Sequence, residues 1–243
     1  MAEAGVKTDE QEKQEETVNK NVISSGNTEL DSRIGGGLPL GSLALIEGAS
    51  GTGKSVLSQQ IAYGALQQGL RVVMFTSENT VRSMVKQMDT IDMSVLDFLL
   101  IRRLRVYPVE FSQGGQDSSK YLLNALNAEE NADLFILDSL SVVAGSITSS
   151  AILQFFEEAK QLCDQGKTIM VTLHPQAPAL MEQLRSLCDA NLVLETERDG
   201  QKLVKMLTVA KIRGASSVTG AIVGFDVEPG WGMRVIPISK ARG

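Results

Sequence analysis

One octapeptide constrains this chain more than any other feature, and it reads Gly48-Ala49-Ser50-Gly51-Thr52-Gly53-Lys54-Ser55. It lies between the apolar segment 42–47 and a segment, 56–66, in which apolar side chains recur at helical spacing. Glycines let the backbone curl so that several N–H groups point into one concavity, and the positive end of a following helix strengthens that field. The pattern is that of a phosphate loop, and the competing interpretation is a chance glycine-rich turn.

Each part of this loop has a physical role in the predicted site. The backbone of residues 48–53 surrounds the β-phosphate, and Lys54 reaches the β- and γ-phosphates. Ser55 gives its hydroxyl to a magnesium ion that also contacts phosphate oxygens, because Mg²⁺ prefers oxygen ligands and keeps several waters. We therefore predict that residues 48–55 bind a nucleoside triphosphate together with Mg²⁺.

Length and composition are typical of one α/β domain with a full core. The chain has 243 residues, of which 43% are hydrophobic, and no useful internal repeat, which excludes a tandem of two such domains. No apolar run reaches the roughly 18 to 20 residues that cross a bilayer, and the first residues lack a basic-then-apolar signal pattern. We expect a cytoplasmic protein.

The net charge and the two cysteines further limit the functional classes to which this protein can belong. A net charge of −6 argues against a protein that coats nucleic acid, because neutralising phosphates requires a basic face. Arg102, Arg103 and Arg105 are either the solvated side of a strand or a docking surface for an acidic partner or a lipid headgroup. Cys163 and Cys188 lack metal-ligand spacing and lie in apolar surroundings, which favours buried free thiols over a disulfide.

The chain divides into a short tail and one domain. Residues 1–20 are polar and acidic, with almost no large apolar side chains, so we expect a disordered tail; a short helix that docks on a partner is the alternative. From residue 21 to residue 243 the pattern is that of a single globular domain.

Strands and helices are predicted to alternate through most of the domain. We expect strands at 42–47, 71–76, 98–106, 133–137 and 168–173, and helices over 56–66, 81–88, 121–126 and 152–163. This alternation indicates an α/β fold with a mainly parallel sheet flanked by helices on both faces. After Cys188, four strand-like runs at 191–196, 203–211, 221–227 and 233–238 predict antiparallel strands at one edge of the sheet.

Two carboxylates follow predicted strands at the edge where ligands bind in open α/β sheets. Asp138 ends the apolar run 134–137 and is expected to hold the magnesium ion through a water, with capping of the next helix as the alternative. Glu78 follows the strand 71–76 and orients or deprotonates the attacking water if that strand lies beside the phosphate-loop strand or one strand away. The alternative role for Glu78 is that of a carboxylate near Thr80 that interacts with the dipole at the start of the next helix.

Three further residues are candidates for contact with a phosphate of the nucleotide. His174, the only histidine, follows the buried strand 168–173 and is either a phosphate sensor or a satisfied turn residue. Lys211 and Arg213 lie on the same side of a late strand and suit one phosphate, of this chain or of a neighbour; a solvated strand end is the alternative.

Several motifs together resemble the RecA/KaiC superfamily of phosphate-loop ATPases. They are Gly35-Gly36-Gly37-Leu38-Pro39 with Gly41-Ser42, the loop 48–55, Leu137-Asp138-Ser139-Leu140, and Lys211-Ile212-Arg213-Gly214. Within that superfamily, residues 76–84, 225–227 and 237–239 look most like the FlaH family of archaeal flagellar accessory proteins, as does the length of a single domain.

The resemblance implies a RecA-like core that binds ATP and Mg²⁺ and assembles as a ring, expected to be hexameric. It also implies partners: a FlaI-type motor ATPase, a cytoplasmic scaffold of the archaeal flagellum (archaellum), and indirectly the membrane platform above them. By this resemblance Lys54, Ser55 and Asp138 are phosphate and magnesium ligands. Lys211 and Arg213 match an element that reaches the nucleotide of the adjacent subunit, which makes hydrolysis depend on oligomerisation.

One position departs from the pattern of the superfamily. KaiC-like ATPases carry two adjacent carboxylates after the second strand, and here Asn79 follows Glu78. We therefore expect a nucleotide switch with slow or no intrinsic hydrolysis. The alternatives are a KaiC-like ATPase or autokinase that phosphorylates Ser216, Ser217 or Thr219, and a RecA-like recombination protein, against which the acidic balance weighs.

Overall fold

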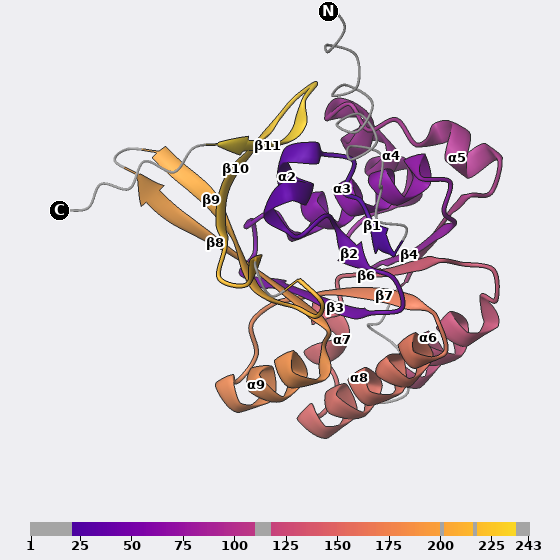
Figure 1. Ribbon diagram of the computed structural model, residues 1–243. Helices are drawn as coiled ribbons and strands as arrows, with labels where there is room; N and C mark the ends of the chain where they lie inside the picture. Colours follow the sequence, from indigo (N-terminus) through magenta and orange to yellow (C-terminus); the bar gives the residue numbers. More distant parts are fainter. Residues whose placement is uncertain (1–20, 110–117, 200–201, 216–217, 237–243) are drawn as a thin grey trace, which may run out of the picture.

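A nine-stranded sheet with helices on both faces forms the centre of the molecule (Figure 1). The computed structural model describes residues 21–109, 118–199, 202–215 and 218–236. The tail expected at 1–20, the FlaH-like residues 237–239, and the candidate phosphorylation sites Ser216 and Ser217 lie outside the described residues. The strand order is β11-β10-β9-β8-β3-β7-β6-β4-β5.

Six strands run parallel and carry the candidate site at their carboxyl ends. They are β8 (Ala190–Asp199), β3 (Leu43–Gly48), β7 (Thr168–Leu173), β6 (Leu134–Asp138), β4 (Val72–Thr76) and β5 (Leu104–Pro108). Every residue of β3, β4, β6 and β7 is buried, as expected for strands that helices cover on both faces. The register aligns Glu47 with Leu173 and Thr76 with Asp138, so the loops that follow these strands meet at one edge.

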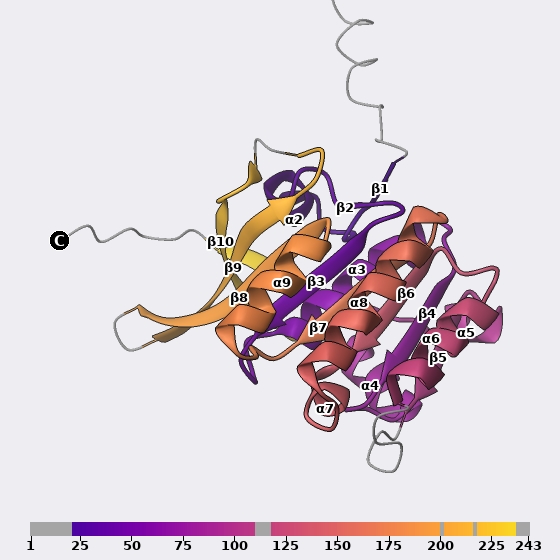
Figure 2. The same cartoon turned by 90° about the horizontal axis from the view of Figure 1, so that it is seen from below.

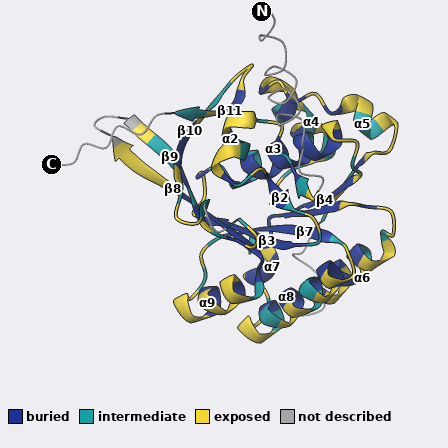
Figure 3. Cartoon of the chain, viewed as in Figure 1, coloured by how far each residue is buried: buried dark blue, intermediate teal, exposed yellow. Residues whose placement is uncertain are grey.

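The helices form two layers with separate apolar cores, as the burial colouring in Figure 3 shows. One layer contains α2 (Thr28–Arg33), α3 (Lys54–Gln67), α4 (Val81–Thr90) and α5 (Leu96–Leu100). The other contains α6 (Ser118–Ala128), α7 (Ser141–Ala144), α8 (Ser149–Asp164) and α9 (Pro178–Leu187), which lie over the sheet in Figure 2. None of the described helices combines the length and apolar composition that a bilayer crossing requires.

Capping residues explain where several helices begin. Thr80 accepts a hydrogen bond from the backbone N–H of Ser83, and Thr148 accepts one from that of Ala151, so each hydroxyl satisfies an N–H that the first turn leaves free. The helix α9 begins instead with Pro178, whose fixed φ suits a first helical position. These signals place the helix starts close to where the sequence predicts them for α4 and α8.

The C-terminal strands form a curved arm at one end of the sheet (Figure 1). The strands β9 (Lys202–Ile212), β10 (Ile222–Glu228) and β11 (Gly232–Ile236) are antiparallel, as predicted. The expectation that 191–196 is also antiparallel to its inner neighbour is wrong, because β8 pairs parallel with β3 through Ala44 and Ala190. The helix α9 supplies the crossover that a parallel pair requires.

The strand predicted at 98–106 is also wrong over its first half. The helix α5 ends near Leu100, Arg102 adopts a left-handed φ of 58°, and β5 begins only at Leu104. An apolar run of this length can fold as one helical turn followed by a strand, and periodicity does not separate the two. A short pair, β1 (Val22–Ile23) with β2 (Leu38–Pro39), was not predicted.

Candidate functional site

The glycine-rich loop connects β3 to α3 and has the backbone that a phosphate cradle needs. Gly51 and Gly53 adopt left-handed φ values of 79° and 102°, which residues with a Cβ rarely adopt. A Cβ on Gly48 would lie 2.4 Å from the carbonyl oxygen of Leu194 on the neighbouring strand. Beside the loop lies a hollow of about 630 Å³ that Pro175 and residues of β8 also line. The predicted position of the loop, between a buried strand and a helix, is therefore confirmed by the geometry.

Lys54 lies folded back over this loop. Its Nζ donates a 2.8 Å hydrogen bond to the carbonyl oxygen of Ala49, and the residue is only 6% exposed. Burial lowers the pKa of this amine, and the charges of Glu78 and Asp138 oppose that shift. A nearly buried cation beside a loop whose backbone N–H groups can face one concavity fits a phosphate group.

Ser55 and Asp138 meet although the chain between them is long. Ser55 Oγ donates to Asp138 Oδ1 at 3.2 Å, and Thr172 Oγ1 donates to the same oxygen at 2.7 Å. Burial raises the pKa of the Asp138 carboxyl, the two hydroxyls and Lys54 lower it, and Glu78 raises it. The peptide bond that follows Asp138 is cis.

The oxygen atoms of Ser55 and Asp138 fit a magnesium ion, but two side chains alone are too few to hold a metal. A hydroxyl and a carboxylate are hard oxygen ligands, which Mg²⁺ prefers. Within the described ranges, no group of three or more His, Cys, Asp or Glu side chains could hold a metal ion. A magnesium ion at this position would therefore complete its shell with phosphate oxygens and water.

Glu78 reaches the site although its strand lies farther from the phosphate-loop strand than the sequence analysis assumed. The strand before it, β4, is separated from β3 by both β7 and β6, so it lies neither beside the phosphate-loop strand nor one strand away. Glu78 nevertheless accepts a 3.1 Å hydrogen bond from Ser139 Oγ, next to Asp138. Asn79 turns elsewhere, because its Oδ1 accepts from Ser83 Oγ in the first turn of α4.

His174 lies at the end of β7, between the phosphate-loop strand and the strand of Asp138. Its backbone N–H donates to Ser141 Oγ at 2.9 Å. Burial lowers the pKa of its imidazole, the charge of Lys54 lowers it further, and Glu78 opposes the shift. The side chain therefore remains neutral near pH 7 and lies within the electrostatic reach of Lys54.

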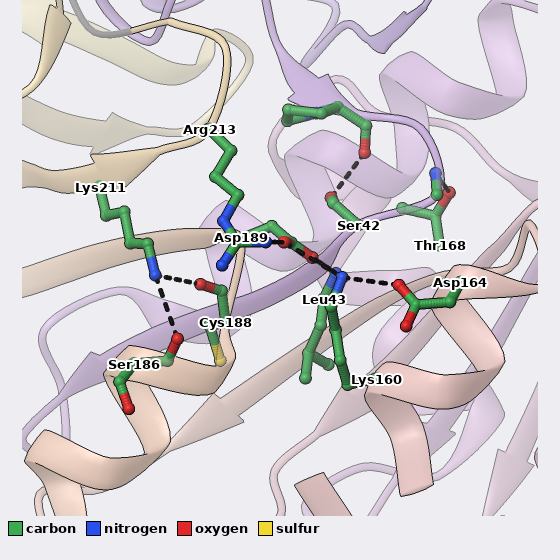
Figure 4. Close-up of polar contacts among 12 residues, drawn as sticks. Ser42, Leu43, Lys160, Asp164, Thr168, Ser186, Cys188, Asp189, Lys211 and Arg213 are labelled. Carbon is green, nitrogen blue, oxygen red and sulfur yellow. Dashed lines mark hydrogen bonds and ion pairs between the residues drawn. The ribbon is translucent and has the colours of Figure 1, made fainter. Parts of the chain in front are cut away.

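Lys211 and Arg213 lie at the opposite edge of the sheet, and Figure 4 shows their polar contacts there. Lys211 Nζ donates to the carbonyl oxygen of Cys188 at 2.6 Å, near the end of α9, and Arg213 forms a 2.9 Å ion pair with Asp189. The register pairs these residues with the amino end of β8, and the length of β3 separates that end from the loop by about 17 Å. The two cations are therefore remote from the phosphate loop of their own chain.

Two polar groups at the carboxyl edge, beside the phosphate loop, were not identified from the sequence. Thr172 lies near the end of the buried strand β7, and its hydroxyl holds Asp138; a polar residue late in a buried strand is the signal that points to it. Glu47 is 2% exposed and accepts two hydrogen bonds from Arg185 on α9, at 2.8 and 2.7 Å. No local pattern links Glu47 to Arg185, because they come together only through the crossover.

Comparison with known proteins confirms the resemblance inferred from the motifs. The family described as ATPase: KaiC matches residues 23–240. The chain is 32% identical over 229 residues to the archaeal flagellar ATP-binding protein FlaH of Sulfolobus acidocaldarius, which covers 91% of this chain and 99% of that protein. The circadian clock oscillator protein KaiC of Thermostichus vulcanus is 29% identical over 136 residues, which is 55% of this chain and 26% of that protein.

A solved structure has the same fold. The crystal structure of the flagellar accessory protein FlaH from Methanocaldococcus jannaschii matches with a TM-score of 0.79 and 28% identity. The match covers 90% of this chain and 99% of that chain. The predicted α/β class, with its RecA/KaiC-like parallel sheet and C-terminal antiparallel strands, is thereby confirmed.

Proposed function

The chain belongs to the KaiC family of ATPases and, within it, to the FlaH family of archaeal flagellar proteins, and we propose that it is an ATP-binding nucleotide switch of the archaellum motor. The observation that carries the proposal is the convergence of Lys54, Ser55 and Asp138 at the mouth of the glycine-rich loop. In this proposal residues 48–53 enclose the β-phosphate and Lys54 neutralises the β- and γ-phosphates.

Ser55 and Asp138 would hold the magnesium ion of the bound nucleotide. The ion supplies charge neutralisation to the phosphates when it is bound. Thr172 holds Asp138 in place through its 2.7 Å hydrogen bond, so the carboxylate stays directed toward Ser55. The left-handed φ values of Gly51 and Gly53 would let the loop backbone follow the phosphate chain.

Slow turnover follows from how few groups are available to position water. Glu78 is the one carboxylate that approaches the site from the turn after β4, and its side chain is bound to Ser139. Asn79 cannot take a proton, and its amide oxygen is engaged by Ser83. His174 would sense the γ-phosphate as a neutral imidazole. A site with strong binding groups and one weakly placed base suits a protein that reports ATP rather than one that consumes it quickly.

Assembly into a ring is the second part of the proposal. Because Lys211 and Arg213 lie about 17 Å from the loop of their own chain, they would act on the nucleotide of an adjacent subunit. We propose a homo-oligomeric ring, hexameric in its complete form, that regulates a FlaI-type motor ATPase within the cytoplasmic scaffold. Its position would be cytoplasmic, at the inner face of the membrane, with the membrane platform contacted only indirectly.

Steady-state ATP hydrolysis, measured against protein concentration together with ATP affinity, tests both parts. Tight binding with negligible turnover that Glu78→Gln leaves unchanged supports the switch. Turnover that rises with protein concentration, and that collapses in Glu78→Gln and in Arg213→Ala, instead identifies a ring ATPase. Failure of the wild type to bind ATP, while Lys54→Ala behaves identically, overturns the proposal.

A further inference from the structure

A large hollow of the described surface lies far from the glycine-rich loop. It has a volume of about 1160 Å³ and lies at the amino ends of β4, β5 and β6, the edge of the sheet opposite to the candidate nucleotide site. Arg71, Arg102 and Arg103 line it together with apolar side chains such as Ile101 and Tyr107. We call it the arginine hollow.

The arginine hollow carries positive charge that its surroundings do not neutralise. Among the described residues, no ion pair is formed by Arg71, Arg102 or Arg103, all of which are exposed. Arg105 is already bound to Glu129 at 2.5 Å. The lining contains two carboxylates, Glu130 and Asp133, of which Asp133 also accepts the backbone N–H of Arg71 at 2.7 Å, so its four arginines outnumber its acidic side chains by two.

The N-terminus of the described chain begins beside this hollow. The backbone N–H of Ser24 donates to Gln68 Oε1 at 3.0 Å, and Gln68 Nε2 donates to the carbonyl oxygen of Val22 at 3.4 Å. Gln68 is followed by Gly69, which lines the arginine hollow; a Cβ added to Gly69 would lie 3.6 Å from a guanidinium nitrogen of Arg103. Residues that precede position 21 therefore enter the molecule next to the three unpaired arginines.

The preceding sequence has the complementary charge at a distance that fits. Residues 9–16, which we call the acidic segment, contain five carboxylates and one lysine. From residue 16 to residue 21 an extended chain spans up to about 17 Å, and from residue 9 up to about 40 Å. A tether this short gives the segment an effective concentration on the order of millimolar at the hollow, so even weak attraction would hold it there.

We propose that the acidic segment docks in the arginine hollow of its own chain. The carboxylates pair with Arg71, Arg102 and Arg103, where the planar guanidinium groups can each bind a carboxylate through two N–H donors. Arg102 occupies the position after α5 where a left-handed φ favours glycine, so an arginine there carries a backbone cost that a bound anion offsets. The contact is screened by salt, because the arginines are exposed.

Paramagnetic broadening in the full-length chain tests this docking. A nitroxide is attached at Gln14→Cys, where the label is selective because Cys163 and Cys188 are buried. At low salt we expect broadened amide resonances for residues 101–103 and sharp resonances for α9. The broadening should disappear at high salt and in a variant in which Glu10, Glu12, Glu15 and Glu16 are changed to Gln, which keeps the length of the tether.

A charge exchange provides the matched control. Arg102→Glu with Arg103→Glu should abolish the broadening, and changing Glu12, Glu15 and Glu16 to Lys in the same chain should restore it. Sharp resonances in the labelled wild type at low salt overturn the proposal, as does broadening that survives in the glutamine variant. If isotope-labelled chains without a nitroxide are broadened when they are mixed with nitroxide-labelled chains, a second copy is the source. Arginine-dependent sedimentation with anionic vesicles, without broadening, identifies a lipid surface. Either result overturns docking within one chain.

Discussion

The carboxylate of Asp189 accepts a 2.9 Å hydrogen bond from the backbone N–H of Leu43, the first residue of the strand that leads to the glycine-rich loop. The same carboxylate binds Lys160 of α8 at 2.9 Å and Arg213 of the late strand at 2.9 Å (Figure 4). Asp189 thus joins the phosphate-loop strand, a covering helix and the proposed trans-acting arginine. A substitution of Asp189 would therefore remove a contact from the phosphate-loop strand, from the covering helix and from Arg213.

Asp189→Ala is therefore expected to destabilise the fold strongly. The variant leaves the buried backbone N–H of Leu43 without its acceptor and removes one of the two carboxylates that bind Lys160, whose other partner is the exposed Asp164. Because Arg213 is more than half exposed, its ion pair with Asp189 contributes little to stability. We expect Asp189→Ala to lower the free energy of unfolding by about 2–4 kcal/mol. Urea denaturation measures it; Asp189→Asn, which keeps an acceptor for Leu43, should lose clearly less, and equal losses would contradict this account.

Gly48→Ala and Gly51→Ala separate close packing from backbone strain. A Cβ at position 48 would lie 2.4 Å from the Leu194 carbonyl oxygen, whereas a Cβ at position 51 has no atom within 4 Å. Gly51→Ala should cost roughly 1 kcal/mol through its φ of 79°, and Gly48→Ala should cost at least about twice that, because β3 and β8 must separate. Thermal unfolding of both variants compares them, and the reverse order would show that β8 yields easily.

Local patterns were sufficient to predict the layers of the fold and the core of the site. The loop 48–55 and the run that ends at Asp138 each lie within one strand and its following turn, so their position at the carboxyl edge follows from the parallel arrangement. The strand order could not be derived in this way. The interposition of β7 and β6 between β3 and β4 depends on which helices cross over, and periodicity does not encode that.

The errors in the prediction have a common physical origin in tertiary context. Residues 98–106 are apolar enough for either state, and their division at Arg102 depends on the packing of Phe98 and Leu99 against the core. The parallel pairing of β8 depends on α9, which begins at Pro178 after the apparent stop at His174-Pro175. The bonds of Glu47 to Arg185 and of Asp138 to Thr172 join distant segments, and no spacing rule predicts such pairs.

The two thiols are expected to resist alkylation in the native state. Burial raises the pKa of Cys163 from 9.0 to about 12 and raises that of Cys188 further, so the reactive thiolate is scarce near pH 8. In the unfolded chain both thiols titrate near 9.0. The free energy of unfolding should therefore fall as the pH rises above 9, because only the unfolded state releases these protons. Mass spectrometry after iodoacetamide treatment, with and without urea, checks the reactivity; fast native labelling would contradict the burial.

Lys54→Ala should weaken ATP binding strongly while leaving the fold intact. Lys54 is 6% exposed and its pKa is lowered by burial, so the apo protein gains little from its charge, and its hydrogen bond to the Ala49 carbonyl oxygen lies within the loop. We expect the free energy of unfolding without ATP to change by less than about 1 kcal/mol, whereas the affinity for ATP falls by about 10- to 150-fold, the loss of a charge-assisted contact. Calorimetric titration and urea denaturation give the two numbers. Lys86→Ala, which removes an exposed lysine from α4, is the matched control, and an equal loss of affinity there would remove Lys54 from its assigned role.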